Sequence, residues 1–140
     1  MAEAIKRDYQ DILKTNRLNI EITNKDDTLI TFQAMDRDNG TYIGHASLMV
    51  TTRCFGQIGE LSYELDERYR GQCYATEILR GAIAYIYAEL GLVSLYGIAP
   101  EKNLAAQYVL QRIGFALNEE LDGFIRYQAW NPKFETTQNI

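Results

Sequence analysis

Polar and hydrophobic residues alternate through the first half of the chain. Leu18, Ile20 and Ile22 are separated by polar residues, and a period of two is typical of a half-buried strand. The same alternation predicts four strands, over residues 17–23, 28–35, 42–51 and 58–65. Short polar turns separate these strands, and Asn39-Gly40 favours a hairpin because glycine readily adopts a positive φ. We therefore expect an antiparallel meander.

In the second half, hydrophobic residues recur at every third and fourth position, which predicts helices. One helix is expected over residues 74–90 and ends at Gly91. Another is expected over residues 103–113, where Asn103 can cap the first turn with its side chain. Further strands are expected over residues 92–98, 115–117 and 124–130.

The chain opens with the spacing of an amphipathic helix. Ile5, Tyr9, Ile12 and Leu13 fall on one face of a helix over residues 3–14. The full order is then this helix, the meander, a helix, a strand parallel to the fourth one, a second helix and a closing hairpin. A chain of 140 residues is long enough for one hydrophobic core. The sequence therefore predicts a single α/β domain over residues 1–140, without repeats or linkers.

The charge balance narrows the range of partners. The formal net charge is -5 and the pI is near 4.9, so no broad basic surface is available for a nucleic acid. An amine or a basic peptide suits this field better. Cys54, Cys73 and the single histidine, His45, form neither a disulfide framework nor a metal cluster by their spacing. We expect a reduced, cytoplasmic protein without a metal, in which His45 is a histidine of the sheet face.

Membrane association is not expected either. Residues 81–99 approach the length of a membrane span, but Gly91 divides them into a helical half and a β-branched half. Both halves suit the core of an α/β unit. The first residues alternate charged and apolar side chains, unlike the continuous apolar core of a signal peptide.

The candidate for chemistry is the segment YRGQCYATEIL, residues 69–79, between a strand and a helix. The N–H groups in the first turn of a helix lack partners, and the helix dipole adds positive charge there, so this context can bind an anion such as pyrophosphate. Gly71 lets a ligand approach the backbone. A plain turn is the alternative, because the glycine pattern of dinucleotide folds and the Gly-Lys-Ser/Thr of nucleotide triphosphatases are both missing.

Two stretches of the sequence resemble one protein family, both in their residues and in their order along the chain. The stretches GELSYELDERYRGQCYATEIL and LGLVSLYGIAPEKNLAAQYVLQRIGF are similar to the GNAT superfamily of acyl-CoA-dependent N-acetyltransferases. Within it they resemble the branch that acetylates ribosomal-protein N-termini (Rim-type enzymes). The signature Arg/Gln-x-x-Gly-x-Gly/Ala falls on residues 70–75, and Thr-Glu falls on Thr76-Glu77. The Asn-x-x-Ser and Leu-Gly-Phe patterns fall on residues 103–106 and 113–115.

The resemblance implies a GNAT fold, a mainly antiparallel mixed sheet of about seven strands that splays between the fourth and fifth. It also implies acetyl-CoA as cosubstrate. The pyrophosphate would be held by the loop residues Arg70, Gly71, Gln72, Cys73, Tyr74, Ala75 and Thr76. Leu65 on the fourth strand would bond the pantetheine arm, and Asn103 would contact it from the other side.

The implied reaction is direct attack of a primary amine on the thioester. An amine with a pKa near 10 must first lose a proton, so a base is needed, and the developing oxyanion needs N–H donors. Glu60 is the first candidate for the base and Glu64 the second. Either could instead be a solvated carboxylate of the sheet face.

The chain departs from the family pattern in its site. Cys73 stands where the loop usually has glycine, as a spacer or a reactive thiol. Ala106 replaces a serine that is proposed to assist the departing thiolate, and Leu110 stands where other branches have tyrosine. Tyr108 lies two residues from Ala106 and turns away from its face, so we expect it to pack.

The last departure is length, because only the short NKDD turn replaces the two helices that the family usually inserts between the first two strands. The acceptor groove is then open, and it suits a protein or peptide N-terminus, a small amine, a groove completed by a second subunit as in a homodimer, or no acceptor. The alternative to an acetyltransferase is an inactive acyl-CoA-binding or regulatory module. Fold analogy does not choose between these functions.

Overall fold

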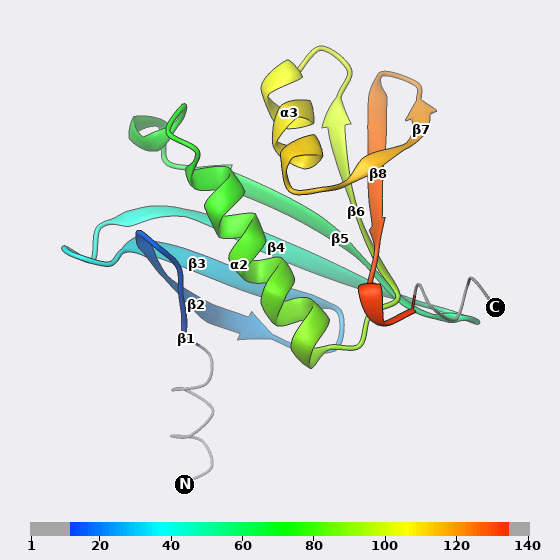
Figure 1. Cartoon of the computed structure of the whole chain (residues 1–140), viewed down its shortest axis with the longest axis horizontal. Helices are drawn as coiled ribbons and strands as arrows, with labels where there is room; N and C mark the ends of the chain where they lie inside the picture. Colours follow the sequence, from blue (N-terminus) through cyan, green and yellow to red (C-terminus); the bar gives the residue numbers. More distant parts are fainter. Residues whose placement is uncertain (1–11, 135–140) are drawn as a thin grey trace, which may run out of the picture.

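The computed structural model describes residues 12–134, which form one curved sheet with two main helices (Figure 1). Within these residues the strands are β1 (Ile12–Lys14), β2 (Leu18–Lys25), β3 (Leu29–Asp36), β4 (Tyr42–Arg53), β5 (Gly56–Leu65), β6 (Ser94–Pro100), β7 (Ala116–Leu121) and β8 (Phe124–Trp130). The main helices are α2 (Tyr74–Glu89) and α3 (Leu104–Arg112), η1 (Glu67–Tyr69) is a short 3-10 turn, and residues 132–134 are also helical. The order in the sheet is β1-β2-β3-β4-β5-β6-β8-β7.

Only β5 and β6 pair in parallel among these strands; all other neighbours are antiparallel. The sheet is therefore mixed and mainly antiparallel, as predicted. The predicted meander is confirmed for β2 to β5, and Gly40 adopts a φ of +74° in the turn between β3 and β4. The strand predicted to lie parallel to the fourth is β6.

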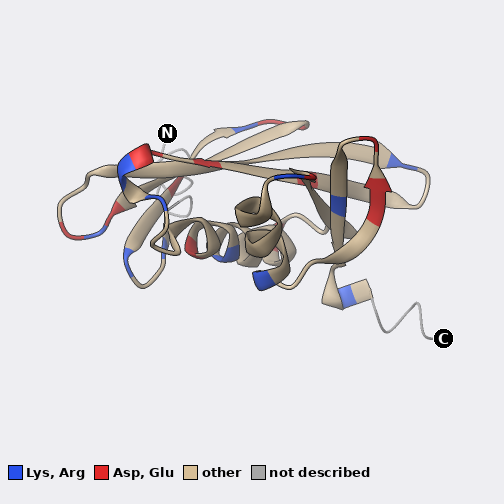
Figure 2. Ribbon diagram, turned by 90° about the horizontal axis from the view of Figure 1, so that it is seen from above, with Lys and Arg blue, Asp and Glu red and all other residues tan. Residues whose placement is uncertain are grey.

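Both helices pack on the same face of the sheet (Figure 2). Helix α2 buries Ile78, Leu79 and Ile86 completely against Phe32 and Leu48 of the strands. Helix α3 packs close to β6, because a Cβ at Gly97 would lie 2.6 Å from Cδ2 of Leu110. No helix among residues 12–134 covers the other face, which we call the open face.

Side chains along β5 point alternately to the core and to the open face. Leu61 points to the core and is 3% exposed, whereas Glu60, Ser62 and Glu64 lie on the open face. The register places His45 of β4 beside Glu64, and Met49 beside Glu60. His45 is thus a residue of the sheet face, as predicted, and its Nδ1 lies 2.9 Å from the hydroxyl of Tyr42.

Two predictions of secondary structure need correction. Residues 12–14 form a strand and not the end of a helix, because they pair with β2, with Leu13 beside Ile20. The remainder of the predicted opening helix, residues 3–11, lies outside the described residues. The strand predicted over residues 115–117 instead runs from Ala116 to Leu121, because the hairpin with β8 continues its pairing to Leu121 and Phe124. The helices between residues 12 and 134 are too short or too polar to cross a membrane.

Candidate functional site

Strands β5 and β6 separate soon after they meet. Their register contains three pairs only, from Ile58 with Ser94 to Glu60 with Tyr96. Beyond them a cleft of about 620 Å³ opens between β5, the loop before α2 and the start of α3. Its lining residues are Tyr63, Glu64, Leu65, Arg70, Gly71, Cys73, Ala75, Thr76, Asn103, Ala105, Ala106, Tyr108 and Val109. We call it the splay cleft.

The loop before α2 presents its backbone to the splay cleft. Gly71 has a φ of +77°, and a Cβ at this position would meet nothing within 4 Å. Glycine is thus required here by the backbone conformation and not by close packing. The helix begins at Tyr74, and no side chain caps its first turn. The free N–H groups of that turn are therefore available to an anion.

Cys73 is the one non-glycine residue with a positive φ in the described chain, at +65°. This left-handed conformation costs an L-residue about 1–2 kcal/mol. The cysteine is exposed and forms no disulfide. The backbone of Cys73 at the end of the loop is thus strained, and such strain is typical of functional loops.

A brace from the start of β2 holds this loop in place. Arg17 donates from Nε to Oε1 of Glu77 at 2.7 Å and from Nη2 to the carbonyl of Gln72 at 3.1 Å. Its guanidinium also lies 3.9 Å from the ring centroid of Tyr74. The other carboxylate oxygen of Glu77 accepts from the Arg17 N–H and the Thr15 hydroxyl. Burial opposes the charged form of Glu77, but these hydrogen bonds outweigh it and lower the pKa of the carboxyl below its ordinary value.

Most of the predicted coenzyme residues meet at the splay cleft. Its lining includes Leu65, Arg70, Gly71, Cys73, Ala75, Thr76 and Asn103. Asn103 also caps α3, because its side-chain oxygen accepts from the N–H of Ala106 at 3.0 Å. Two predicted residues are not part of the lining. Gln72 donates to the carbonyl of Arg68 at 3.2 Å, and the side chain of Tyr74 is buried beneath Arg17.

The family can be assigned from the sequence match. A family model described as the acetyltransferase (GNAT) domain matches residues 3–116. The chain belongs to the GNAT acetyltransferase family. Acetyl-CoA is the cosubstrate of GNAT acetyltransferases, and the splay cleft has the features that such a ligand needs: an open strand edge, free helix N–H groups and an uncrowded glycine. No curated protein matches the sequence of this GNAT chain.

Solved structures share the GNAT fold with this chain at low identity. The ribosomal-protein-S5-alanine acetyltransferase of Vibrio fischeri is 19% identical, with a TM-score of 0.67, over 77% of this chain and 64% of that one. This chain therefore spans less than two thirds of that protein. The spermidine N-acetyltransferase of Vibrio cholerae in complex with CoA and spermine is 17% identical, with a TM-score of 0.67, over 77% and 69%. A GNAT acetyltransferase of Bacillus anthracis is 12% identical, with a TM-score of 0.70, over 86% and 98%.

The two candidate bases occupy different places in this GNAT sheet. Glu60 is half-buried on the open face, at the last pair of β5 and β6, where the hydroxyl of Tyr96 donates to its Oε1 at 3.5 Å. Glu64 is exposed and lines the splay cleft. They are four positions apart along β5, which corresponds to about 13 Å. One reacting amine therefore cannot contact both carboxylates.

Helix α3 differs from its prediction at one residue of the site. Tyr108 was expected to pack, but it is 58% exposed and lines the splay cleft with Ala105 and Ala106. The prediction was wrong because α3 covers the sheet with its Leu110 side only, which leaves its first turns open to the cleft. Leu110 itself is 4% exposed and belongs to the core.

A second cleft of about 690 Å³ adjoins the splay cleft and shares Cys73 and Thr76 with it. Its lining contains three arginines, Arg17, Arg80 and Arg112. Arg17 is paired with Glu77, whereas Arg80 and Arg112 form no ion pair with a carboxylate within residues 12–134. We call it the arginine cleft, and its charge suits an anionic group.

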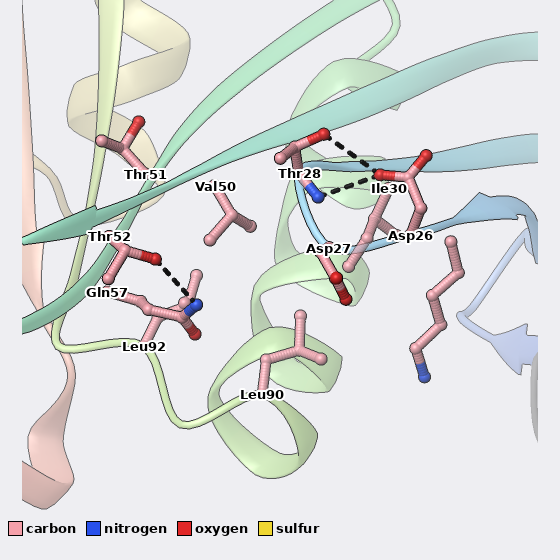
Figure 3. Close-up of a pocket in the computed structure, with 11 residues that line it drawn as sticks. Asp26, Asp27, Thr28, Ile30, Val50, Thr51, Thr52, Gln57, Leu90 and Leu92 are labelled. Carbon is pink, nitrogen blue, oxygen red and sulfur yellow. Dashed lines mark hydrogen bonds between the residues drawn. The ribbon is translucent and has the colours of Figure 1, made fainter.

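A third cleft, of about 860 Å³, lies at the far end of α2 (Figure 3). Several of its polar side chains already bond to neighbouring residues. The carboxylate of Asp26 accepts from the N–H of Thr28 at 2.9 Å, and the hydrogen bonds of the turn lower the pKa of Asp26. Gln57 donates to the hydroxyl of Thr52 at 3.2 Å. None of the predicted site residues lies there, and no cluster of metal-ligating side chains occurs in the described part of the chain.

Sequence reasoning missed several residues near the site. Thr15 and Arg17 lie in the turn between β1 and β2 and belong to no sequence motif, so their contacts with Glu77 could not be foreseen. Ala105 and Val109 line the splay cleft, and their spacing of four on α3 could have indicated this. Tyr96 contacts Glu60 from a strand that the sequence identifies only as part of the core.

Proposed function

We propose that this protein transfers the acetyl group of acetyl-CoA to a primary amine, on a protein or peptide N-terminus or on a small molecule. The amine attacks the thioester directly, in a ternary complex. The observation that supports this proposal most is the splay cleft, where an open strand edge meets a glycine loop and an uncapped helix. A pantetheine arm can bond the edge while the pyrophosphate lies at the helix start.

The proposed site residues have distinct roles. The loop from Arg70 to Thr76 binds the pyrophosphate through its backbone, including the N–H groups of Gln72 and Tyr74. Leu65 bonds the pantetheine arm and Asn103 contacts it from α3. The arginine cleft adjoins the loop, and the phosphorylated ribose of CoA would extend toward it. Cys54 and Cys73 are both unpaired and exposed, in keeping with a reducing cytoplasm.

Glu60 is the proposed base that accepts the proton of the attacking ammonium, directly or through water. It sits at the mouth of the splay on the open face, where an acceptor can reach the thioester without displacing the coenzyme. Glu64 lies further along the same face of β5, lines the splay cleft and is the second candidate. Backbone N–H groups of β5, which are free where β6 has separated, would stabilise the oxyanion.

The second candidate function is an acyl-CoA-binding or regulatory module without catalysis. Ala106 and Leu110 favour it, because neither of them can donate a proton to a departing thiolate. The strained Cys73 in the loop adds a side chain near the phosphate position. This module would bind acetyl-CoA with the same cleft and release no free CoA.

Two assays on the full chain separate these functions. Thermal unfolding with acetyl-CoA at about a hundred times Kd should add roughly 2.7 kcal/mol, a shift of several degrees. Ala105→Trp fills the splay cleft at an exposed position and should abolish the shift while the variant remains folded. Release of the CoA thiol with a panel of peptide, lysine and polyamine acceptors then identifies an enzyme. Binding without release indicates the module, and the absence of binding contradicts both.

A further inference from the structure

The open face beside Glu60 combines charged and apolar side chains. Across the mouth of the splay, the register aligns Met49, Glu60, Tyr96 and Gln128 in one row. Around this row the exposed apolar residues are Met49 at 55%, Phe124 at 47%, Trp130 at 42% and Ile98 at 39%. Helices α2 and α3 lie on the opposite face of the sheet (Figure 2). An acceptor that approaches Glu60 must therefore lie on this surface.

Arg126 of β8 faces the same surface. Its Cζ lies 4.2 Å from the ring centroid of Tyr96, so the guanidinium stacks on the residue whose hydroxyl donates to Glu60. Its Nε is buried and has no hydrogen-bond partner. Glu119 of β7 is its neighbour in the register, yet within residues 12–134 the two do not form an ion pair. A cation is thus fixed in orientation while part of its hydrogen-bonding capacity is unused.

The charged groups near Tyr96 shift the pKa of its hydroxyl. Burial raises the pKa of the Tyr96 hydroxyl, and the carboxylate of Glu60 raises it further, whereas Arg126 and Arg53 act in the opposite direction. The phenol therefore stays protonated at neutral pH. Glu60 and Arg126 thus contact the same ring, one through its carboxylate and the other through its guanidinium, so that a negative and a positive group lie on either part of Tyr96.

We propose that Arg126 binds a carboxylate of the acceptor while Glu60 faces its amine, so that the acceptor is an amine that also bears a carboxylate. This inference rests on the proposed acetyltransfer. The planar guanidinium forms two parallel hydrogen bonds with a carboxylate, and stacking on Tyr96 orders it beforehand. A peptide with a free N-terminus and a glutamate or aspartate close to it has both groups.

An acceptor with one ammonium and one carboxylate has no net charge to be repelled by the acidic protein. An ammonium and a carboxylate cancel, so a net charge of -5 does not repel the molecule. A polyamine would match the net charge better, but its second ammonium would meet Arg126. The local arrangement therefore favours the zwitterionic acceptor over the polycation, in contrast to the expectation from net charge alone.

The test compares matched peptide acceptors on the full chain, with kcat/KM measured from the release of CoA thiol. All peptides begin with alanine and are amidated at the C-terminus. The two peptides of a pair differ only in having glutamate or glutamine at one position, which is the second residue in one pair and the third in the other. Spermidine serves as the polycation. For the wild type we expect kcat/KM to be about tenfold higher for glutamate in at least one pair, and lower for spermidine than for that peptide.

Variants assign the preference to one side chain. Arg126→Gln should reduce the glutamate-to-glutamine ratio to about one, with the glutamine peptide still acetylated, which also shows that the variant is folded. Arg126→Lys should keep part of the ratio. The control Lys133→Gln removes one positive charge from an exposed position after β8 and should leave the ratio unchanged. A purely structural role of Arg126 would lower both rates equally and keep the ratio.

Several results would overturn the inference. These are a wild-type ratio near one in both pairs, a ratio that survives in Arg126→Gln, or spermidine as the better acceptor. If Arg126→Gln does not fold, the wild-type ratio and its reduction in Arg126→Lys decide. If no amine of any kind is acetylated, the proposed function fails and this inference fails with it, whereas transfer without a glutamate preference refutes the inference alone.

Discussion

Arg17 and Glu77 are sixty residues apart in sequence and form a two-point contact. Nε of Arg17 donates to one carboxylate oxygen of Glu77 at 2.7 Å, and the Arg17 N–H donates to the other at 2.7 Å. The same arginine bonds the carbonyl of Gln72. A strand edge is thereby tied to the loop that presents the first turn of α2, so the shape of the anion site depends on the β1–β2 corner.

Glu77→Gln should lower the free energy of unfolding by about 1–3 kcal/mol at pH 7, because it removes a charged acceptor from a partly buried network. The pKa of Glu77 is lowered in the folded state, so its contribution is present above the unfolded value of about 4.3. It is lost as the pH falls through the lower folded value. Urea unfolding at pH 7 and pH 3.5 measures this, with Glu89→Gln on the exposed side of α2 as the control. A difference between wild type and variant that does not shrink at the lower pH would contradict the prediction.

Cys73→Gly should raise the free energy of unfolding by about 1 kcal/mol, because glycine adopts a φ of +65° without steric cost. Cys73→Ala keeps the Cβ and should leave stability unchanged. The measurement is thermal unfolding of both variants, with and without acetyl-CoA. If the side chain of Cys73 crowds the phosphate, both variants bind acetyl-CoA more tightly than wild type; equal affinities would identify it as a spacer.

Glu60→Gln should reduce kcat by 10² to 10⁴-fold and leave the Kd for acetyl-CoA unchanged, because the amide keeps the shape of the side chain but accepts no proton. Glu64→Gln is the matched comparison on the same strand. Single-turnover rates and titration of acetyl-CoA measure the two quantities separately. The larger loss in Glu64→Gln would assign the base to Glu64 instead.

Gly97→Ala should destabilise the protein by about 1–3 kcal/mol, because the added Cβ would lie 2.6 Å from Cδ2 of Leu110. Leu110→Ala shortens the opposing side chain and so leaves room for that Cβ. The double variant should therefore be more stable than the sum of the two single losses predicts. Urea unfolding of all four proteins measures the coupling, and simple additivity would argue against the contact.

Sequence patterns identified the strands and helices whose periodicity is local. Alternation at Leu18, Ile20 and Ile22 and the Asn103 cap follow directly from residue spacing, and both are present in the structure. Residues 12–14 were mistaken for helix because a three-residue edge strand has no period of its own and forms only where β2 offers hydrogen bonds. Long-range pairing thus decided what local spacing did not.

The site likewise combines features that one segment of sequence predicts with contacts that depend on the fold. The loop from Arg70 to Thr76 is contiguous in sequence, and its position before a helix could be predicted. The stacking of Arg126 on Tyr96, and the link from Tyr96 to Glu60, join three strands whose neighbours are set by the sheet order. No pattern within a single segment encodes such contacts, because they depend on which strands become neighbours.

The three-pair contact of β5 and β6 has a mechanical consequence. In the described sheet these pairs are the only ladder that joins β1–β5 to β6–β8, so the two halves of the sheet are held together by few strand hydrogen bonds beside the splay cleft. A pantetheine arm in the splay cleft would bond the free edge of β5 in the way that a neighbouring strand does and would stiffen this junction. Amide exchange along residues 61–65 should then slow when acetyl-CoA binds, so that the cosubstrate becomes a temporary part of the fold.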